Sequence, residues 1–314
     1  MDWIKKGIQN AVGFMIRILG IYRLLQKVVW REQVAILVYH DPEPEIFRKH
    51  ILFLSKYHQF ISLSRFVAAM YRNDKTAIPV DSLIVTLDDG HQGNYRLLET
   101  FKTFQLRPTI YLCSHIVNTH RHFWWKSGYS TPQQLKKLPH HQALTLLYDE
   151  VNFTPTKEYP DRQTLSASEL FAMFPYVEFG SHTKFHPILP NCTSEESEEE
   201  IRDSKTSLEK LLNQPIEQFC FPNGDYGARE LSYLRKHGYR SARTLVWGRN
   251  NLRPDPFQLK VVEVLDNSSV NMLFVQLCGF FGAFRKTRSG FRRILENTKR
   301  RKQKKMLNRR GKYL

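Results

Sequence analysis

A short apolar run that ends in two adjacent aspartates and a glycine constrains the fold of this chain more than any other feature. Residues 83–87 have the length and composition of a buried strand. Asp88 and Asp89 follow at its C-terminal end, and Gly90 then permits a sharp turn of the backbone. Carboxylates are costly to desolvate, so two of them at the end of a buried strand indicate a site that needs their charge. For an isolated Asp-Asp-Gly sequence, a hydrated turn is the alternative interpretation.

Two histidines further along the chain supply partners for these carboxylates. His182 and His186 are four positions apart, which places both imidazoles on one face of a helical turn. With Asp89 they make three protein ligands for a divalent metal and leave coordination positions open for water and substrate. Asp88 is then free to take a proton from the water that the metal activates. The donor set suits Zn²⁺, and Co²⁺, Ni²⁺ and Fe²⁺ are also compatible, so the sequence predicts a metal hydrolase.

Three motifs in this order resemble those of the polysaccharide deacetylase family, whose catalytic unit is the NodB-homology domain. They are residues 86–90 (TLDDG), His182-x-x-x-His186 and residues 219–224 (FCFPNG), within a resemblance that runs from about residue 34 to about residue 266. The resemblance implies an α/β fold, a distorted (β/α) barrel. It also implies a hydrolase that removes N-acetyl groups from amino sugars of a glycan or glycolipid. In that family Asp88 would be the base, and Asp89, His182 and His186 would hold the metal.

Four further residues are candidates for substrate contact. Pro222, Asn223 and Gly224 form a rigid turn that we expect along the pocket wall, although Pro-Asn-Gly is also an ordinary turn sequence. Trp124 is a candidate for stacking on a sugar face, while aromatic pairs such as Trp124 and Trp125 are also common in protein cores.

The chain departs from the family pattern in two places. Many members carry a C-terminal Leu-x-His whose histidine is the general acid, but here the only histidine after position 186 is His237. The resemblance implies that relatives whose first strand ends in Tyr-His use that histidine instead, so His40 is the candidate acid, with a buried structural histidine as the alternative. Similar proteins also carry an arginine that orients the catalytic aspartate near residues 259–262. Lys260 is the nearest cation there, which leaves that role in doubt.

Strand-like and helix-like segments alternate between residues 33 and 267, which is typical of an α/β domain. The stretch 114–164 interrupts the alternation, and we expect it to form a lid or a substrate-facing insertion. We therefore divide the chain into an N-terminal helix (1–32), a catalytic domain (33–267), and an apolar segment with a basic tail (268–314). The four cysteines are widely spaced, which favours free thiols and a reducing compartment.

The net charge of +17 resides at the two ends of the chain. Residues 284–314 hold fourteen lysines and arginines against the single acid Glu296, and residues 1–32 hold six basic and two acidic side chains. Residues 33–283 are neutral. An acidic partner is therefore expected for the ends rather than for the catalytic domain. The tail has little aromatic interleaving, so we expect an anionic membrane surface and no nucleic acid.

Residues 3–30 have the periodicity of one amphipathic helix, with Ile8, Met15 and Ile18 on its apolar face. Arg17 lies within the apolar stretch and no small-residue cleavage site follows, which argues against a signal peptide. A helix lying in the membrane plane and a helix docked on the barrel both remain open. These features predict a cytoplasmic protein that is peripheral at the membrane, with the cell envelope as the alternative location.

The predicted activity has two rivals. One is a non-catalytic, membrane-associated protein that binds glycans and keeps the site residues as structure; the other is a hydrolase of a different non-peptide amide. Intact Asp88, Asp89, His182 and His186 favour catalysis. The identity of the sugar, its attachment to a lipid, the native metal and the oligomeric state are left open by the sequence.

Overall fold

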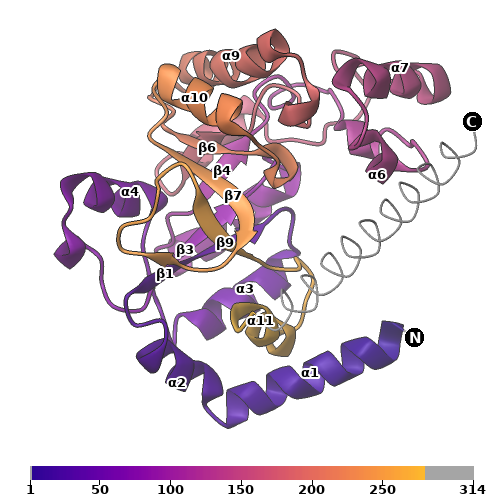
Figure 1. Ribbon diagram of the computed structural model, residues 1–314. Coiled ribbons are helices and arrows are strands. Elements are labelled where there is room, and N and C mark those ends of the chain that lie inside the picture. Colours follow the sequence, from indigo (N-terminus) through magenta and orange to yellow (C-terminus); the bar gives the residue numbers. More distant parts are fainter. Residues whose placement is uncertain (1, 280–314) are drawn as a thin grey trace, which may run out of the picture.

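Seven parallel strands close into a barrel at the centre of this computed structural model, which describes residues 2–279 (Figure 1). The strands are β1 Gln33–Tyr39, β3 Ser82–Leu87, β4 Thr109–Leu112, β5 Glu178–Ser181, β6 Gln218–Cys220, β7 Ser241–Trp247 and β9 Leu259–Glu263. The ring closes because β1 pairs in parallel with both β3 and β9. Two short strands extend it, β2 (Gln59–Phe60) beside β3 and β8 (Asn250–Asn251) antiparallel to β1. The predicted distorted (β/α) barrel is therefore confirmed.

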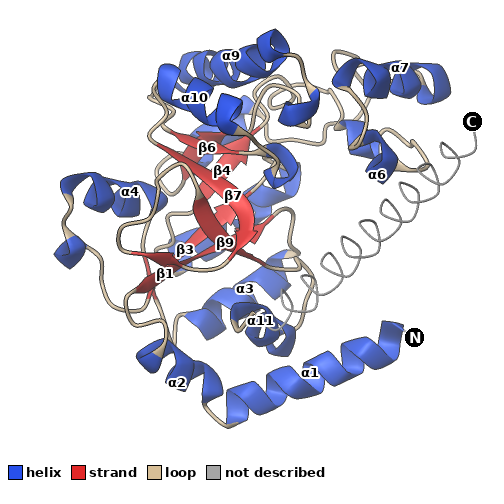
Figure 2. Ribbon diagram, viewed as in Figure 1, coloured by secondary structure: helices blue, strands red, loops and turns tan. Residues whose placement is uncertain are grey.

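Helices surround the barrel (Figure 2). Those of the catalytic domain outside the insertion are α3 Pro44–Leu54, α4 Leu63–Arg72, α5 Leu98–Thr103, α8 Ala167–Met173, α9 Ser194–Leu212 and α10 Ala228–Lys236, with the 3-10 helices η1 Lys75–Ala77, η2 Gln92–Leu97, η4 Leu189–Asn191 and η5 Pro222–Gly224. A capping box between Thr193 and Glu196 starts α9.

The strand β1 illustrates why the central strands are apolar on both faces. Ala35, Leu37 and Tyr39 belong to a cluster that includes residues of the surrounding helix α3. Val34 and Ile36 alternate with them and belong to a second cluster, which contains residues of the other strands and of α4. Parallel strands are covered on both faces. Alternate residues of a strand therefore pack into two different clusters, and both sets of residues must be apolar. The parallel arrangement also gathers the carboxyl ends of all seven strands at one end of the barrel, where active sites of barrel enzymes form.

The predicted insertion lies between β4 and α8 and has helices of its own. They are η3 Trp124–Lys126, α6 Pro132–Leu135 and α7 His140–Val151. Leu135, Leu147 and Phe153 form a small separate core within this segment. Figure 1 shows α6 and α7 at the edge of the molecule, away from α1.

The N-terminal segment forms two helices, so the prediction of one continuous helix over residues 3–30 is wrong. α1 (Asp2–Ile18) and α2 (Ile21–Val28) are separated at Gly20, whose φ of 64° requires the left-handed conformation. No single helix among residues 2–279 is long and apolar enough to cross a membrane. The segments Gly7–Ile18 and Ile21–Val28 reach that length and composition only when taken together, and a bend of 64° lies between them.

The N-terminal helices pack on a helix from the other end of the chain. α11 (Val270–Leu277) contacts both α1 and α3, as Figure 1 also shows. Ile16 of α1 and Tyr22 of α2 are buried in this contact, whereas Ile8, Met15 and Ile18 remain exposed. One side of the N-terminal segment is therefore docked, and an apolar part of it still faces outward.

The apolar segment after residue 268 begins as a core helix. Residues 272–277, on α11, are all buried. This part of the apolar segment is thus covered by protein and is not available to a lipid surface. The basic tail, residues 285–314, lies outside the described residues.

Candidate metal centre and active site

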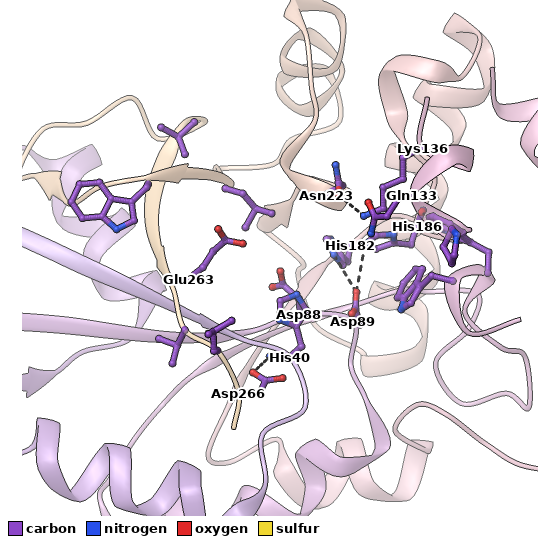
Figure 3. A pocket seen from close by; sticks show the side chains of 18 of the residues that line it. His40, Asp88, Asp89, Gln133, Lys136, His182, His186, Asn223, Glu263 and Asp266 are labelled. Atoms are coloured by element: carbon purple, nitrogen blue, oxygen red, sulfur yellow. Dashed lines mark hydrogen bonds and ion pairs between the residues drawn. The ribbon is translucent and has the colours of Figure 1, made fainter. Parts of the chain in front are cut away.

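Three side chains of the predicted metal site converge at the carboxyl end of the barrel (Figure 3). Asp89 follows β3, and its Oδ1 lies 3.4 Å from Nε2 of His182 and 3.5 Å from Nε2 of His186. All three residues are buried, and Asp89 Oδ1 has no hydrogen-bond partner among the described residues. Ligand atoms about 2.1 Å from a tetrahedral ion lie about 3.4 Å apart, so these spacings match a shared ion. The donor set therefore fits a divalent metal.

Neighbouring groups orient the ligands and set their charge. Nδ1 of His182 donates to the Cys220 carbonyl oxygen at 2.8 Å, which directs Nε2 toward the site. Burial by itself lowers the pKa of His182, but Cys220 and the Asp89 carboxylate outweigh it and hold that pKa well above its usual value, so this imidazole would give up a proton on binding a metal. Burial lowers the pKa of His186 to about 3, so this imidazole stays neutral. Burial by itself raises the pKa of Asp89, but the imidazoles of His182, His91 and His186 outweigh it and hold that pKa well below its usual value.

The two histidines do not share a helical turn, so that prediction is wrong. β5 ends at Ser181, and residues 182–188 form a loop. Thr183 and His186 have φ values of 66° and 59°, a left-handed conformation that non-glycine residues rarely adopt. The imidazoles converge all the same, with ring centroids 4.6 Å apart. The loop backbone, rather than helical periodicity, brings them together.

Glu200 of α9 stabilises this loop through hydrogen bonds to its backbone. Its carboxylate accepts hydrogen bonds from the backbone N–H groups of Lys184, at 2.7 Å, and Phe185, at 3.1 Å. Burial raises the pKa of Glu200 to about 7. Glu200 thus connects α9 to the loop that carries the two histidines.

Asp88 is paired with a buried arginine. Arg243 of β7 is fully buried, and its Nη2 donates to Asp88 Oδ1. Burial by itself raises the pKa of Asp88, but the positive charges of Arg243, His182 and His40 outweigh it and hold that pKa below its usual value. Asp88 is thus an ionised carboxylate at neutral pH, as a general base must be.

Arg243 makes the contact with the aspartate that similar proteins assign to an arginine near residues 259–262; it lies on β7, in register with Leu259 of β9. Lys260 is exposed and does not take this role. The signal for Arg243 was present in the sequence, because a charged residue between Ala242 and Thr244 interrupts an otherwise uncharged strand. A buried arginine needs an anionic partner, and the free carboxylate at the end of β3 provides it.

His40 follows β1 and lines the same cavity as Asp88. Its backbone is firmly held: the N–H groups of His40 and Asp41 donate to the Asp266 carboxylate at 3.0 and 2.8 Å, and Asn94 donates to the His40 carbonyl at 2.7 Å. His237 lies elsewhere and pairs with Glu198 at 2.8 Å. The placement of His40 beside the catalytic carboxylate is compatible with the acid role, which stays a prediction.

The cavity at this end of the barrel has a volume of about 1060 Å³. Asn223 and Trp124 line it, whereas Pro222 and Gly224 are not among its lining residues and shape the turn that carries Asn223. Lys136 of the insertion donates to Asn223 Oδ1 at 2.6 Å, so the insertion and the third motif meet at the cavity wall. Trp124 donates its indole N–H to the His186 carbonyl at 2.9 Å and therefore also supports the ligand loop.

Sequence reasoning missed His91, which lies two positions after Asp89. Its Nε2 is 3.1 Å from Asp89 Oδ2, and because a carboxylate only accepts, the imidazole donates. Its ring contacts Phe123 edge-on at 4.9 Å between centroids. This contact ties the metal ligand to the start of the insertion.

The comparisons with known proteins bear on the fold and the family of this chain. Among curated proteins, none matches the chain. Solved structures of the same fold include the deacetylase PplD of Streptococcus pyogenes in complex with acetate, which is 18% identical, has a TM-score of 0.58, and covers 78% of this chain and 97% of its own. IcaB from Ammonifex degensii is 16% identical, with a TM-score of 0.59. The match covers 78% of this chain and 96% of the IcaB chain. A de-N-acetylase from Aggregatibacter actinomycetemcomitans is 12% identical with a TM-score of 0.56 and covers 78% and 99%. The family model of polysaccharide deacetylase matches residues 75–242, more than half of the chain, and the chain therefore belongs to this family.

Proposed function

We propose that this protein is a metal-dependent hydrolase that removes the N-acetyl group from an amino sugar of a glycan or glycolipid. One observation carries the proposal: an ionised carboxylate, Asp88, lies directly beside three convergent metal-ligating side chains in a large cavity. Membership of the polysaccharide deacetylase family supports the substrate class.

Different residues of the chain would bind the metal, accept a proton and donate a proton. A divalent ion held by Asp89, His182 and His186, of the zinc type by its donor set, would supply Lewis acidity toward the acetamide carbonyl and the attacking water. Asp88 takes the proton of that water, and Arg243 keeps its carboxylate ionised and oriented. His40 then gives a proton to the sugar nitrogen as the C–N bond breaks, so that acetate and a free amine leave.

The test is acetate release from a panel of N-acetylated saccharides and lipid-linked sugars, together with metal content. Asp89→Ala, His182→Ala and His186→Ala should each lose stoichiometric metal, because two protein ligands are too few. Asp88→Asn should keep the metal and the fold but lower turnover on the order of 10² or more, since the base is lost. His40→Ala should also keep the metal while turnover falls on the order of 10² to 10⁴.

Three outcomes would contradict these assignments. One tightly bound metal per chain in a ligand variant would remove that residue from the site. Near wild-type turnover in Asp88→Asn would mean that the two aspartates are assigned wrongly. A panel without any acetate release, at full metal occupancy, would favour the non-catalytic glycan-binding protein or a hydrolase of a different amide.

We further propose that the protein works as a peripheral protein on the cytoplasmic face of a membrane. The exposed side chains of Ile8, Met15 and Ile18 on α1 and the fourteen basic residues of the C-terminal segment support this location. The cell envelope is the alternative.

A further inference from the structure

The two ends of the active-site cavity differ in chemistry. In Figure 3, Lys136, Gln133 and Asn223 lie on one side of the aspartates, and Glu263 lies on the other. The paired strands β7 and β9 bring apolar side chains to the same cavity: Leu245, Val246 and Trp247 on β7, and Val264 and Leu265 after β9. Val246, Trp247 and Leu265 are 52%, 41% and 49% exposed, which is unusual for large apolar side chains grouped at the wall of one cavity.

A buried amide lies at this apolar end. Gln276 of α11 lines the cavity and is only 2% exposed. Neither its Oε1 nor its Nε2 has a hydrogen-bond partner among residues 2–279. A buried amide that lacks both partners is costly, so its position indicates a ligand group that accepts from one atom and donates to the other.

The apolar end also lies on the side of the barrel that carries the N-terminal helices. α11, which contributes Gln276, packs against α1. Gly279, just after α11, lies so close to Trp247 that a Cβ atom there would be 2.2 Å from the indole ring. In Figure 1, α11 and α1 lie together on one side of the barrel, and α6 with Lys136 lies on another. The apolar wall is thus next to the end of α11, the helix on which α1 packs.

We propose that the substrate is amphiphilic: an N-acetylated amino sugar linked to a lipid, with its hydrocarbon chain along Val246, Trp247 and Leu265. This inference rests on the proposed deacetylase function and names its substrate class. The acetamide group reaches the metal ligands, a polar group near the sugar–lipid linkage pairs with Gln276, and Lys136 and Asn223 face the sugar. A polysaccharide fits this wall poorly, because hydroxyl groups packed against Val246 and Leu265 would lose their hydrogen bonds to water.

The test compares methyl and octyl glycosides of N-acetylated hexosamines, used below the concentration at which the octyl compounds form micelles. The octyl chain should raise kcat/KM about tenfold or more, mainly through KM, which corresponds to about two buried methylene groups. The double variant Trp247→Ser/Leu265→Ser should bring the octyl-to-methyl ratio close to one. Phe171→Ser, at an exposed apolar residue of α8 outside the cavity, should retain the wild-type ratio.

A second variant separates ligand contact from structure at the buried amide. Gln276→Leu introduces an apolar side chain of similar size and removes two unpaired polar atoms, so its thermal stability should equal or exceed that of the wild type. Its KM for the octyl glycosides should nevertheless rise several-fold. An unchanged KM would overturn the contact with Gln276.

The outcomes distinguish this inference from the function on which it rests. Acetate release from both glycosides with a ratio near one in the wild type would overturn the lipid-linked substrate and leave the deacetylase intact. The same ratio in the wild type and in the double variant would overturn the assignment of the apolar wall. No release from either glycoside, at full metal occupancy, would overturn both proposals together.

Discussion

At the scale of single residues, His91 sets the orientation of the anionic metal ligand. It donates to Asp89 Oδ2, the carboxylate oxygen that does not face His182 and His186. Groups that orient metal ligands in this way contribute about 10- to 100-fold to metal affinity. We expect His91→Phe, which keeps a flat ring against Phe123, to lower the affinity by about that factor, as measured by competition with a chelator.

The chain offers a matched control for this variant. His122 is also paired with an aspartate, Asp161, at 3.2 Å, but this pair is not in contact with the metal ligands. His122→Phe should leave the affinity unchanged. Equal affinities of His91→Phe and the wild type would show that Asp89 needs no such support.

The buried charge of Arg243 helps to hold the pKa of Asp88, the proposed base, below its usual value. Since Asp88 is buried, the loss of its cationic partner should raise the pKa of its carboxyl group. A base with a raised pKa is protonated at a higher pH, so in Arg243→Met the acid limb of the kcat/KM profile should move upward in pH. Arg240→Met, at a half-exposed arginine nearby that pairs with Glu217, should leave the limb in place.

Arg243→Met should also lower the stability of the fold, and this effect must be separated from the effect on catalysis. An unpaired buried charge costs about 3–5 kcal/mol of unfolding free energy. Asp88→Asn/Arg243→Met removes both charges and should recover part of that loss. If the acid limb of the kcat/KM profile of Arg243→Met lies at the same pH as in the wild type, that limb reports a group other than Asp88.

At the scale of secondary structure, the docking of α1 depends on one glycine. A Cβ atom on Gly13 would lie 1.9 Å from the carbonyl oxygen of Asn271, at the start of α11. Gly13→Val should therefore push α1 away from α11 and speed amide hydrogen exchange in residues 2–18. Overpacking of this kind costs about 1–3 kcal/mol.

Gly7 provides the comparison on the same helix, because nothing lies within 4 Å of a Cβ atom placed there. Gly7→Val should keep α1 docked. Exchange in the barrel strands should be the same in both variants. Equally slow exchange of α1 in both would mean that the close contact at Gly13 does not control docking.

At the scale of the whole molecule, the excess positive charge lies outside the segment that contains the candidate active site. Residues 33–283 are neutral, and the surplus of +17 lies at the ends. Each basic residue contributes about 1 kcal/mol near an anionic leaflet, less when many act together. We therefore expect the protein to sediment with anionic liposomes, less so at high salt, and only weakly after deletion of residues 285–314.

Neutral liposomes are the control for this experiment. The exposed apolar side chains of α1 alone should give weak binding to them, because they lack the electrostatic contribution. Equal binding to neutral and anionic vesicles, or binding to neither, would contradict the membrane location. The barrel should unfold at the same temperature with and without the tail.

Local patterns determined a large part of this protein. An apolar run of strand length followed by Asp88, Asp89 and Gly90 identified β3 and its functional end, and the first strand and His40 followed in the same way. These features depend on neighbours in the chain: strand periodicity, turn residues and the parallel order that gathers carboxyl ends at one edge. For that reason the α/β alternation and three metal-ligand candidates were predictable without coordinates, while the barrel followed from the resemblance to the polysaccharide deacetylase family.

The tertiary structure alone decided the contacts that cross the barrel. Arg243 meets Asp88 across 155 residues of sequence, and the pairing exists only because the strands close into a ring that brings β7 and β3 to one centre. Likewise, Glu200 shapes the loop of His182 and His186, which spacing alone assigns to a helical turn. Local periodicity carries no information about which distant side chain will satisfy a buried charge or a strained loop, because that choice is made by packing.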